Sequence, residues 1–97
     1  MHIVSRKILR EFWEKHSDAR QPLQAWFADV QHAHWTGPKE IKAIYHNASF
    51  LPGNRVVFNI KGNTYQLVVV VQYKFGYVYI RFIGTHQEYD RINAGTI

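Results

Sequence analysis

The sequence predicts a single α+β domain over residues 1–97, in which helices from the first half pack on an antiparallel sheet formed by the second half. Two patterns support this prediction. Apolar residues recur at helical spacing up to about residue 45, and alternating or β-branched runs separated by short turns fill residues 55–83. With 46% hydrophobic and 15% aromatic residues, the chain can bury one modest core, but it is too short for a second domain.

The first half contains two predicted helices that follow a short strand candidate, HIV, at residues 2–4. Ser17 or Asp18 can cap the second helix, and Pro22 is tolerated there only in the first turn. The pattern breaks at Gly37-Pro38, a short helical turn follows at residues 40–45, and residues 46–54 are expected to form a loop. We interpret the apolar stripes of the two helices as core: Ile8, Leu9, Phe12 and Trp13, then Leu23, Trp26, Phe27 and Val30.

The second half contains three predicted strands, at residues 55–60, 64–73 and 77–83, which make a twisted sheet of about four strands together with HIV. Gly62-Asn63 is a two-residue hairpin loop in which the glycine supplies a positive φ. This loop places Asn59 opposite Gln66 and Arg55 opposite Val70. Pairing Tyr73 with Val78 then places Val70 opposite Arg81, although a bulge in this hairpin would turn Arg81 to the other face.

These registers predict two different sheet faces. One is apolar and forms the core: Val56, Phe58, Ile60, Tyr65, Leu67, Val69, Val71, Val78, Ile80 and Phe82. The other carries Arg55, Asn59, Gln66 and Arg81 among valines and tyrosines. This second face is polar and basic, and it lies close to a short C-terminal helix that begins near Thr85.

Composition restricts the possible partners and the compartment. A net charge of +5 and a pI near 9.7 favour binding to polyanions such as nucleic acid, although an acidic protein could also cover the basic face and many small basic proteins bind no nucleic acid. No apolar run approaches the roughly 20 residues that span a bilayer, and the N-terminus lacks a secretory h-region. Without cysteine there is no disulfide framework. We therefore expect a cytoplasmic protein that does not enter membranes.

Neither a metal nor an organic cofactor is expected. His32 and His34 form an H-x-H pair, but the sequence offers no third ligand beside it, so we interpret both as solvated loop residues. The chain also lacks a P-loop, a G-x-G-x-x-G motif and a nucleophile elbow.

The segment FIGTHQEYDRI, residues 82–92, contains the strongest candidate for chemistry. His86 and Asp90 are four residues apart, so on a helix they share a face and the carboxylate can hold one imidazole tautomer. RNA cleavage by attack of its own 2′-OH needs a proton acceptor, a proton donor and cations around the phosphorane. We expect His86 to donate the proton, Tyr89 to stack on a base or bind phosphate, and Arg55 and Arg81 to stabilise the phosphate. The alternative is that Asp90 pairs locally and His86 is merely exposed.

RVVFNIKGNTYQLVV followed by VYIRFIGTHQEYDRI resembles the HigB toxins, a branch of the RelE superfamily of toxin–antitoxin systems. The N-terminal MHIVSRKILREFWEKHSDA and the central EIKAIYHNASFL also resemble this family, so the similarity extends to about Asn93. The resemblance implies a RelE-like fold, metal-independent mRNA endonuclease activity, often on the ribosome, and neutralisation by a HigA-type antitoxin.

Eight residues of the chain match residues that recur in the family, and one residue, Gln66, departs from the family pattern. The matching residues are Lys42, Asn59, Gly62, Asn63, Arg81, His86, Tyr89 and Asp90. Gln66 departs from the pattern, because relatives usually carry an arginine there that acts on the phosphate. Glutamine keeps hydrogen bonding but loses the charge, which leaves Arg55, Arg81 or Lys42 to supply it. A non-catalytic module that binds RNA or an antitoxin is therefore the alternative function, and the general base stays open, with Lys42 as one candidate.

Overall fold

A computed structural model describes residues 1–97, and it has the α+β architecture that the sequence predicts. The elements follow one another as β1 (His2–Val4), α1 (Arg6–Lys15), the 3-10 helix η1 (Ser17–Ala19), α2 (Arg20–Gln31), α3 (Pro38–Ile44), β2 (Ser49–Leu51), β3 (Arg55–Ile60), β4 (Tyr65–Gln72), β5 (Tyr77–Thr85) and α4 (His86–Asp90). None of the helices combines the length and the apolar character that crossing a membrane requires.

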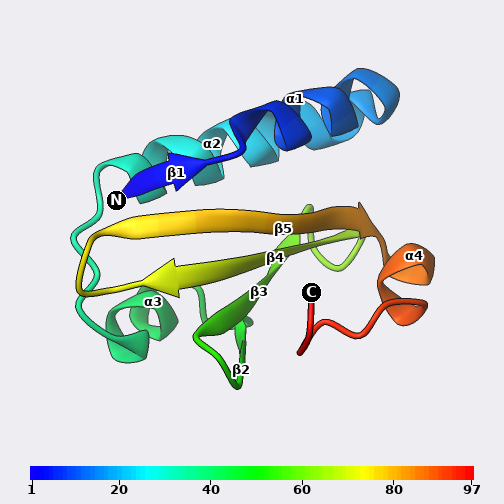
Figure 1. Cartoon of the computed structure of the whole chain (residues 1–97). Helices are drawn as coiled ribbons and strands as arrows, with labels where there is room; N and C mark the ends of the chain where they lie inside the picture. Colours follow the sequence, from blue (N-terminus) through cyan, green and yellow to red (C-terminus); the bar gives the residue numbers. More distant parts are fainter.

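The five strands form one sheet in the order β1-β5-β4-β3-β2 (Figure 1). The prediction of about four antiparallel strands was wrong in two details. β1 pairs with β5 in parallel, which makes the sheet mixed. β2 lies inside the segment that we expected to be a loop, and it pairs with β3 at Ser49–Leu51. Three residues are too few to show the alternation by which a strand is recognised.

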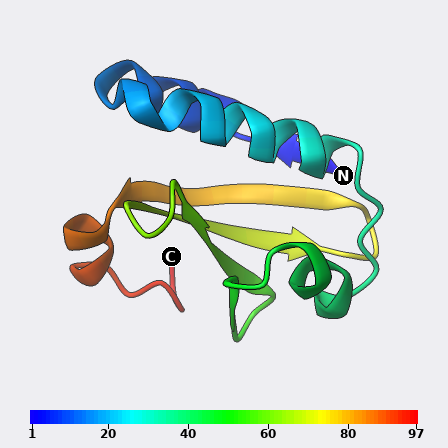
Figure 2. The same cartoon turned by 180° about the vertical axis from the view of Figure 1, so that it is seen from behind.

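Helices α1 and α2 lie together over one face of the sheet, whereas α3 and α4 lie at its two ends (Figures 1 and 2). Neither Ser17 nor Asp18 caps α2, because both belong to η1 and the Asp18 carboxylate is engaged elsewhere. It accepts hydrogen bonds from Lys61 Nζ at 2.6 Å and from the Tyr65 hydroxyl at 2.5 Å. These bonds tie the start of the helical layer to the β3–β4 hairpin and lower the pKa of Asp18.

The main core lies between α1, α2 and the sheet, as the apolar stripes predicted. Leu9, Leu23, Trp26 and Val30 are buried there, whereas Ile8 from the same stripes stays 36% exposed. The rings of Trp26, Trp35 and Tyr45 pack around the buried Phe58 on β3, with centroids 5.0 to 6.2 Å away. This aromatic cluster anchors the loop after α3 to the sheet.

The two hairpins differ in how well the sequence predicted them. In β3–β4, Asn59 pairs with Gln66 and Arg55 with Val70, as expected, and Gly62 has a φ of 63°. In β4–β5 the predicted register was wrong, because Val70 pairs with Tyr79 instead of Arg81. The turn closes earlier, at Gly76 with a φ of 74°, and a bulge at Val68/Val69 then takes up one extra residue of β5.

The bulge changes which side chains line the second face of the sheet. Phe82 was predicted to lie in the main core, but it packs instead in a smaller cluster on the opposite face. Buried Val57, Val68 and Ala94 form the centre of this cluster, with Leu51, Tyr89, Ile92 and Ile97 around it. The segment after α4 thus folds back over part of the face that the sequence predicted to be polar (Figure 1).

Candidate functional site

The short helix α4 is fixed at its first residue by a capping box. Glu88 N–H donates to Thr85 Oγ1 at 3.2 Å, and the Glu88 carboxylate accepts from Thr85 N–H at 2.8 Å. Reciprocal bonds of this kind satisfy two of the backbone donors that a helix start leaves free. They also lower the pKa of Glu88, chiefly through the Thr85 backbone N–H. His86 follows the cap directly, so its backbone is held although the helix has only five residues.

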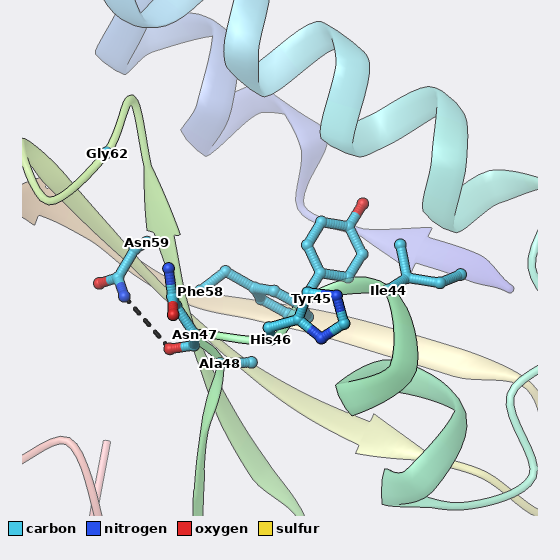
Figure 3. Close-up of a pocket in the computed structure, with 8 residues that line it drawn as sticks. All are labelled: Ile44, Tyr45, His46, Asn47, Ala48, Phe58, Asn59 and Gly62. Atoms are coloured by element: carbon cyan, nitrogen blue, oxygen red, sulfur yellow. Dashed lines mark hydrogen bonds between the residues drawn. The ribbon is translucent and has the colours of Figure 1, made fainter.

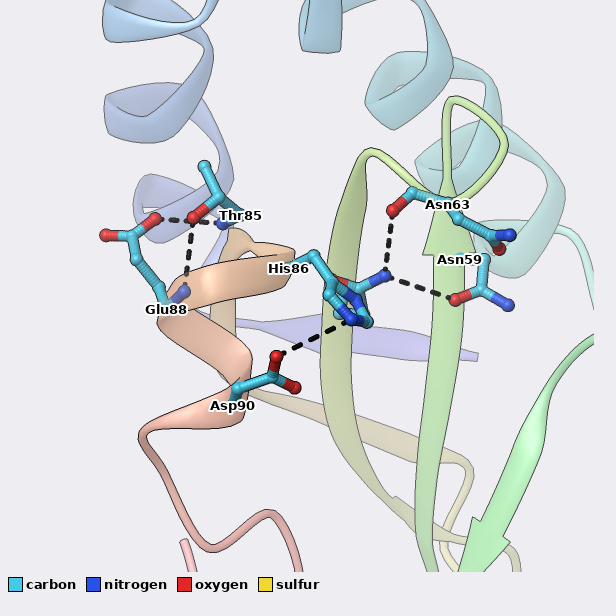
Figure 4. Close-up of polar contacts among 7 residues, drawn as sticks. Asn59, Asn63, Thr85, His86, Glu88 and Asp90 are labelled. Carbon is cyan, nitrogen blue, oxygen red and sulfur yellow. Dashed lines mark hydrogen bonds and ion pairs between the residues drawn. The ribbon is translucent and has the colours of Figure 1, made fainter.

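His86 and Asp90 share one face of α4, as their spacing predicted. His86 Nε2 lies 3.5 Å from Asp90 Oδ2, and the two side chains are 64% and 60% exposed. The imidazole points from α4 toward the β3–β4 hairpin, which carries Asn59 and Asn63 (Figure 4). The pair is therefore open to a ligand lying between α4 and this hairpin.

A row of three residues connects the hairpin to α4. Asn59 pairs with Gln66 on β4, and Gln66 pairs with Gly84 on β5, two residues before His86. Gln66 is the only polar residue in the buried class, with 4% of its surface exposed. A Cβ atom on Gly84 would lie 2.5 Å from Phe82 Cζ, so the Phe82 ring lies over the glycine beside it.

The Gln66 amide is used within the protein. Its Nε2 donates to Asn63 O at 3.1 Å and reaches Asn59 Oδ1 at 3.5 Å, while its buried Oε1 has no hydrogen-bond partner. Because Asn63 O is a carbonyl that can only accept, the nitrogen must lie on that side and the oxygen is left unpaired. Gln66 therefore braces the hairpin and Asn59.

The two arginines of the predicted site have different surroundings. Arg81 is the extra residue of the bulge, is exposed, and forms no hydrogen bond or ion pair. Arg55 is half-buried at the other end of the same face, and its Nε donates to Ile97 O at 2.9 Å. The segment after α4 thus engages Arg55, whereas the Arg81 guanidinium is free for a ligand.

Lys42 lies far from His86, whereas Tyr89 lies on the same helix as His86 but is half-buried (Figure 1). Lys42 lies on α3, at the opposite end of the sheet from α4, and its Nζ donates to Ala48 O at 2.9 Å (Figure 1). Tyr89 lies on α4 but is half-buried, with its ring centroid 6.4 Å from that of Phe82. The structure therefore brings together Asn59, Gln66, His86 and Asp90, with Tyr89 beside them and Lys42 apart.

Two features of the site were missed in the sequence. The capping box has a visible signal, T-x-x-E at residues 85–88, which predicts the start of α4 at His86. The second feature is an open cavity of about 310 Å³ beside Asn59, lined in part by His46 and Asn47 (Figure 3). No motif marks it, because its lining comes from a loop and a strand that only the fold brings together.

The exposed His86–Asp90 pair and free Arg81 can act on a polyanion. An imidazole can give or take a proton near neutral pH, and a carboxylate can orient it. A free guanidinium can bind phosphate oxygens. No three histidine or carboxylate side chains come together in a way that could hold a metal ion.

The chain is similar in sequence to known proteins along most of its length. The profile of the HigB_toxin family, described as the RelE-like toxic component of a toxin-antitoxin system, matches residues 19–92. The chain is 30% identical to the mRNA interferase toxin HigB of Escherichia coli K12, over 97% of this chain and 92% of that protein. The mRNA interferase HigB of Shigella flexneri matches with the same identity and the same coverage of both chains. The chain therefore belongs to the HigB toxin family of RelE-like toxins.

Proposed function

We propose that this toxin is an endoribonuclease that cleaves mRNA and thereby inhibits translation and growth. The observation that carries the proposal is the exposed His86, held on a capped helix with Asp90 Oδ2 3.5 Å from its Nε2 and directed toward the β3–β4 hairpin. Two relatives, from Escherichia coli K12 and Shigella flexneri, are named as mRNA interferases, which supports the same activity.

In the proposed reaction the 2′-oxygen attacks the adjacent phosphorus and the bond from phosphorus to the 5′-oxygen breaks. His86 gives its proton to the leaving 5′-oxygen, so the products carry a 2′,3′-cyclic phosphate and a 5′-hydroxyl. Asp90, whose Oδ2 lies 3.5 Å from His86 Nε2, orients the imidazole. The proton of the attacking 2′-OH goes to a base that we do not assign. No metal takes part in these steps.

In the proposed reaction, Arg81 is the main residue that stabilises the negative charge of the phosphorane. The phosphorane carries negative charge on its equatorial oxygens, and an arginine directed at them lowers the barrier. Arg81 is exposed and has no partner within the chain, whereas Arg55 already donates its Nε to Ile97 O. Arg55 keeps its terminal nitrogens for a second contact with the RNA backbone, and Tyr89 positions the nucleotide. Lys42, at the far end of the sheet, serves at most as a distant backbone contact.

The proposed partners follow from the family and the charge. As the toxic component of a toxin–antitoxin system, the protein is expected to be held inactive by an antitoxin, which we propose is of the HigA type. A net charge of +5 suits both RNA and an antitoxin segment rich in Asp or Glu. We further propose that cleavage takes place on mRNA bound to the ribosome, in the cytoplasm.

One observation favours a second function, binding of RNA or antitoxin without cleavage. Where the family resemblance leads us to expect a strand arginine, this chain has Gln66, and its amide nitrogen is already engaged with Asn63 O at 3.1 Å. The neutral amide supplies no charge to the phosphorane. If the remaining cations do not compensate, the protein would block translation by binding alone.

Induced expression of three forms of the protein separates these functions. His86→Gln removes the proposed acid, and Gln87→Ala changes the exposed neighbour on the same helix as a control. Mapping RNA 5′ ends after induction should reveal new cleavage sites with the wild type and with Gln87→Ala. Loss of a positioned acid in His86→Gln should lower the rate of cleavage by a factor of about 10² to 10⁴. Growth arrest by the wild type without new 5′ ends would support binding alone, and full cleavage by His86→Gln would reject the role of His86.

A further inference from the structure

We propose that the cavity between the loop after α3 and the end of β3 is a subsite for one base of the RNA. This inference rests on the proposed function and adds to it a place where the substrate is read. β2 pairs only with Arg55–Val57, so the edge of β3 from Phe58 onward has no neighbouring strand. The loop Tyr45–Ala48 passes along this open edge, and the space between them is the cavity of about 310 Å³ (Figure 3).

The aromatic side of the cavity is rigid. The Tyr45 hydroxyl donates to Asp29 Oδ2 at 3.2 Å, and its ring meets that of Phe58 edge to face with centroids 5.0 Å apart. Burial, and then the neighbouring Asp29 carboxylate, raise the pKa of Tyr45, so it stays neutral. Phe58 itself is 1% exposed and fixed in the main core. A planar ligand would therefore meet the accessible part of the half-buried Tyr45 ring, held in place by the buried Phe58 behind it, as a preformed surface at low entropic cost.

The polar side of the cavity consists of amides with unused hydrogen-bonding capacity. Asn59 Nδ2 donates to Asn47 O at 3.2 Å, and its Oδ1 accepts weakly from Gln66. One N–H and one lone pair of the Asn59 amide remain, and a primary amide offers this pair of groups to the edge of a base. The side chains of His46 and Asn47 are exposed and form no hydrogen bond within the chain.

The cavity lining carries no acidic or strongly basic side chain, which restricts the ligands that it can bind. No Lys, Arg, Asp or Glu lines the cavity, so nothing in it would compensate a phosphate or a cation. The accessible Tyr45 ring combined with neutral amides matches an unstacked base, which proteins bind by stacking and by hydrogen bonds to its edges. The larger cavity nearby, of about 500 Å³, is lined mainly by apolar residues and lacks side-chain amides.

The cavity also lies at a suitable distance from His86. Asn59, Gln66 and Gly84 form one row across β3, β4 and β5, and adjacent strands lie about 4.8 Å apart, so the row spans roughly 10 Å. A single strand of RNA can cross this distance with very few nucleotides. A base in the cavity would therefore belong to a nucleotide close to the scissile phosphate, and the cavity would contribute to the choice of cleavage site.

The first experiment measures binding without cleavage. The four nucleosides, which carry no phosphate, are titrated into ¹⁵N-labelled full-length His86→Gln protein, and amide shifts are followed by NMR. We expect saturable shifts at residues 45–48 and 58–62. When His46→Ala or Asn47→Ala is added to the His86→Gln protein, the affinity for the nucleoside should fall by about tenfold, which is the magnitude expected for the loss of one contact with a base. His34→Ala is the matched control, because it removes an exposed loop histidine outside the cavity. No shifts at the cavity, or equal binding by all variants, would overturn the subsite.

The second experiment separates failure of the subsite from failure of the proposed function. His46→Ala, Asn47→Ala and His34→Ala are placed in the otherwise wild-type protein, and KM, kcat and the bases flanking each cut are compared. We expect a higher KM and relaxed base preference for the two cavity variants, with kcat near that of the wild type. Unchanged preference with active cleavage rejects the subsite alone. Nucleoside binding in a protein that cuts no RNA rejects the nuclease and retains the subsite.

Discussion

Replacing Gln66 with leucine should leave the protein about as stable as the wild type, although a buried hydrogen bond is lost. The bond from Gln66 Nε2 to Asn63 O, at 3.1 Å, contributes about 1 kcal/mol, while the 3.5 Å contact with Asn59 lies at the limit for a hydrogen bond. Against this loss, the substitution removes an amide oxygen that is buried without a partner, which costs the native state about 1 to 3 kcal/mol. Leucine also nearly conserves the volume.

The expected free energy of unfolding of Gln66→Leu therefore lies between that of the wild type and about 2 kcal/mol above it. Gln66→Ala is the matched control, because it differs from the leucine variant by a cavity worth about 2 to 5 kcal/mol. Urea and thermal unfolding, both in a His86→Gln background, would measure these differences, since 1 kcal/mol shifts the melting temperature by about 4 to 8 °C here. A loss above about 2 kcal/mol in Gln66→Leu would refute the reasoning and make the amide network a main source of stability.

Further predictions concern α4 and its surroundings. Thr85→Ala should lower the free energy of unfolding by about 1 kcal/mol in thermal melts, and should slow RNA cleavage because the cap holds His86. Hydrogen bonds from Thr85 lower the pKa of Glu88 in the folded state, so ionised Glu88 stabilises the fold at neutral pH. This stabilisation is lost as the pH falls below the ordinary pKa of 4.5 and the carboxylate is protonated. Glu88→Gln should therefore flatten the acid side of a stability–pH curve. Asp90→Asn should slow cleavage less than His86→Gln, because the amide still bonds the imidazole. Arg81→Ala should weaken cleavage and RNA binding in gel-shift and single-turnover assays without lowering the melting temperature, since Arg81 has no partner in the chain.

Local signals in the sequence were sufficient for much of the fold. The stripes of Leu9, Leu23, Trp26 and Val30 predicted the helical layer, because helical periodicity reports directly on a buried face. Gly62-Asn63 predicted the register of β3 and β4, because a short loop fixes which residues face each other. The proximity of Asn59, Gln66 and His86 follows from that register and from the place of α4 directly after β5.

Long-range packing accounts for what the sequence could not predict. The three residues of β2 are recognisable only through their pairing with β3. Arg55 was expected to face RNA, but its Nε meets Ile97 O, 42 residues away in the chain. No local pattern predicts that the segment after α4 returns across the sheet, because Ala94 and Ile97 lie in a short stretch without periodicity. The cavity beside Asn59 depends in the same way on a loop docked by the aromatic cluster.

The bulge in β5 explains why glutamine suits position 66. A one-residue shift moves every following side chain to the other face of a sheet, and here it brings Phe82 to the face of Gln66 and over Gly84. Gln66 is 4% exposed on this face, and a guanidinium held there would lose most of its hydration unless it were paired. A neutral amide avoids that cost and still braces Asn59. Arg81 is itself the extra residue of the bulge and is exposed on the neighbouring strand, so we infer that the charge expected at position 66 is supplied from the bulge instead.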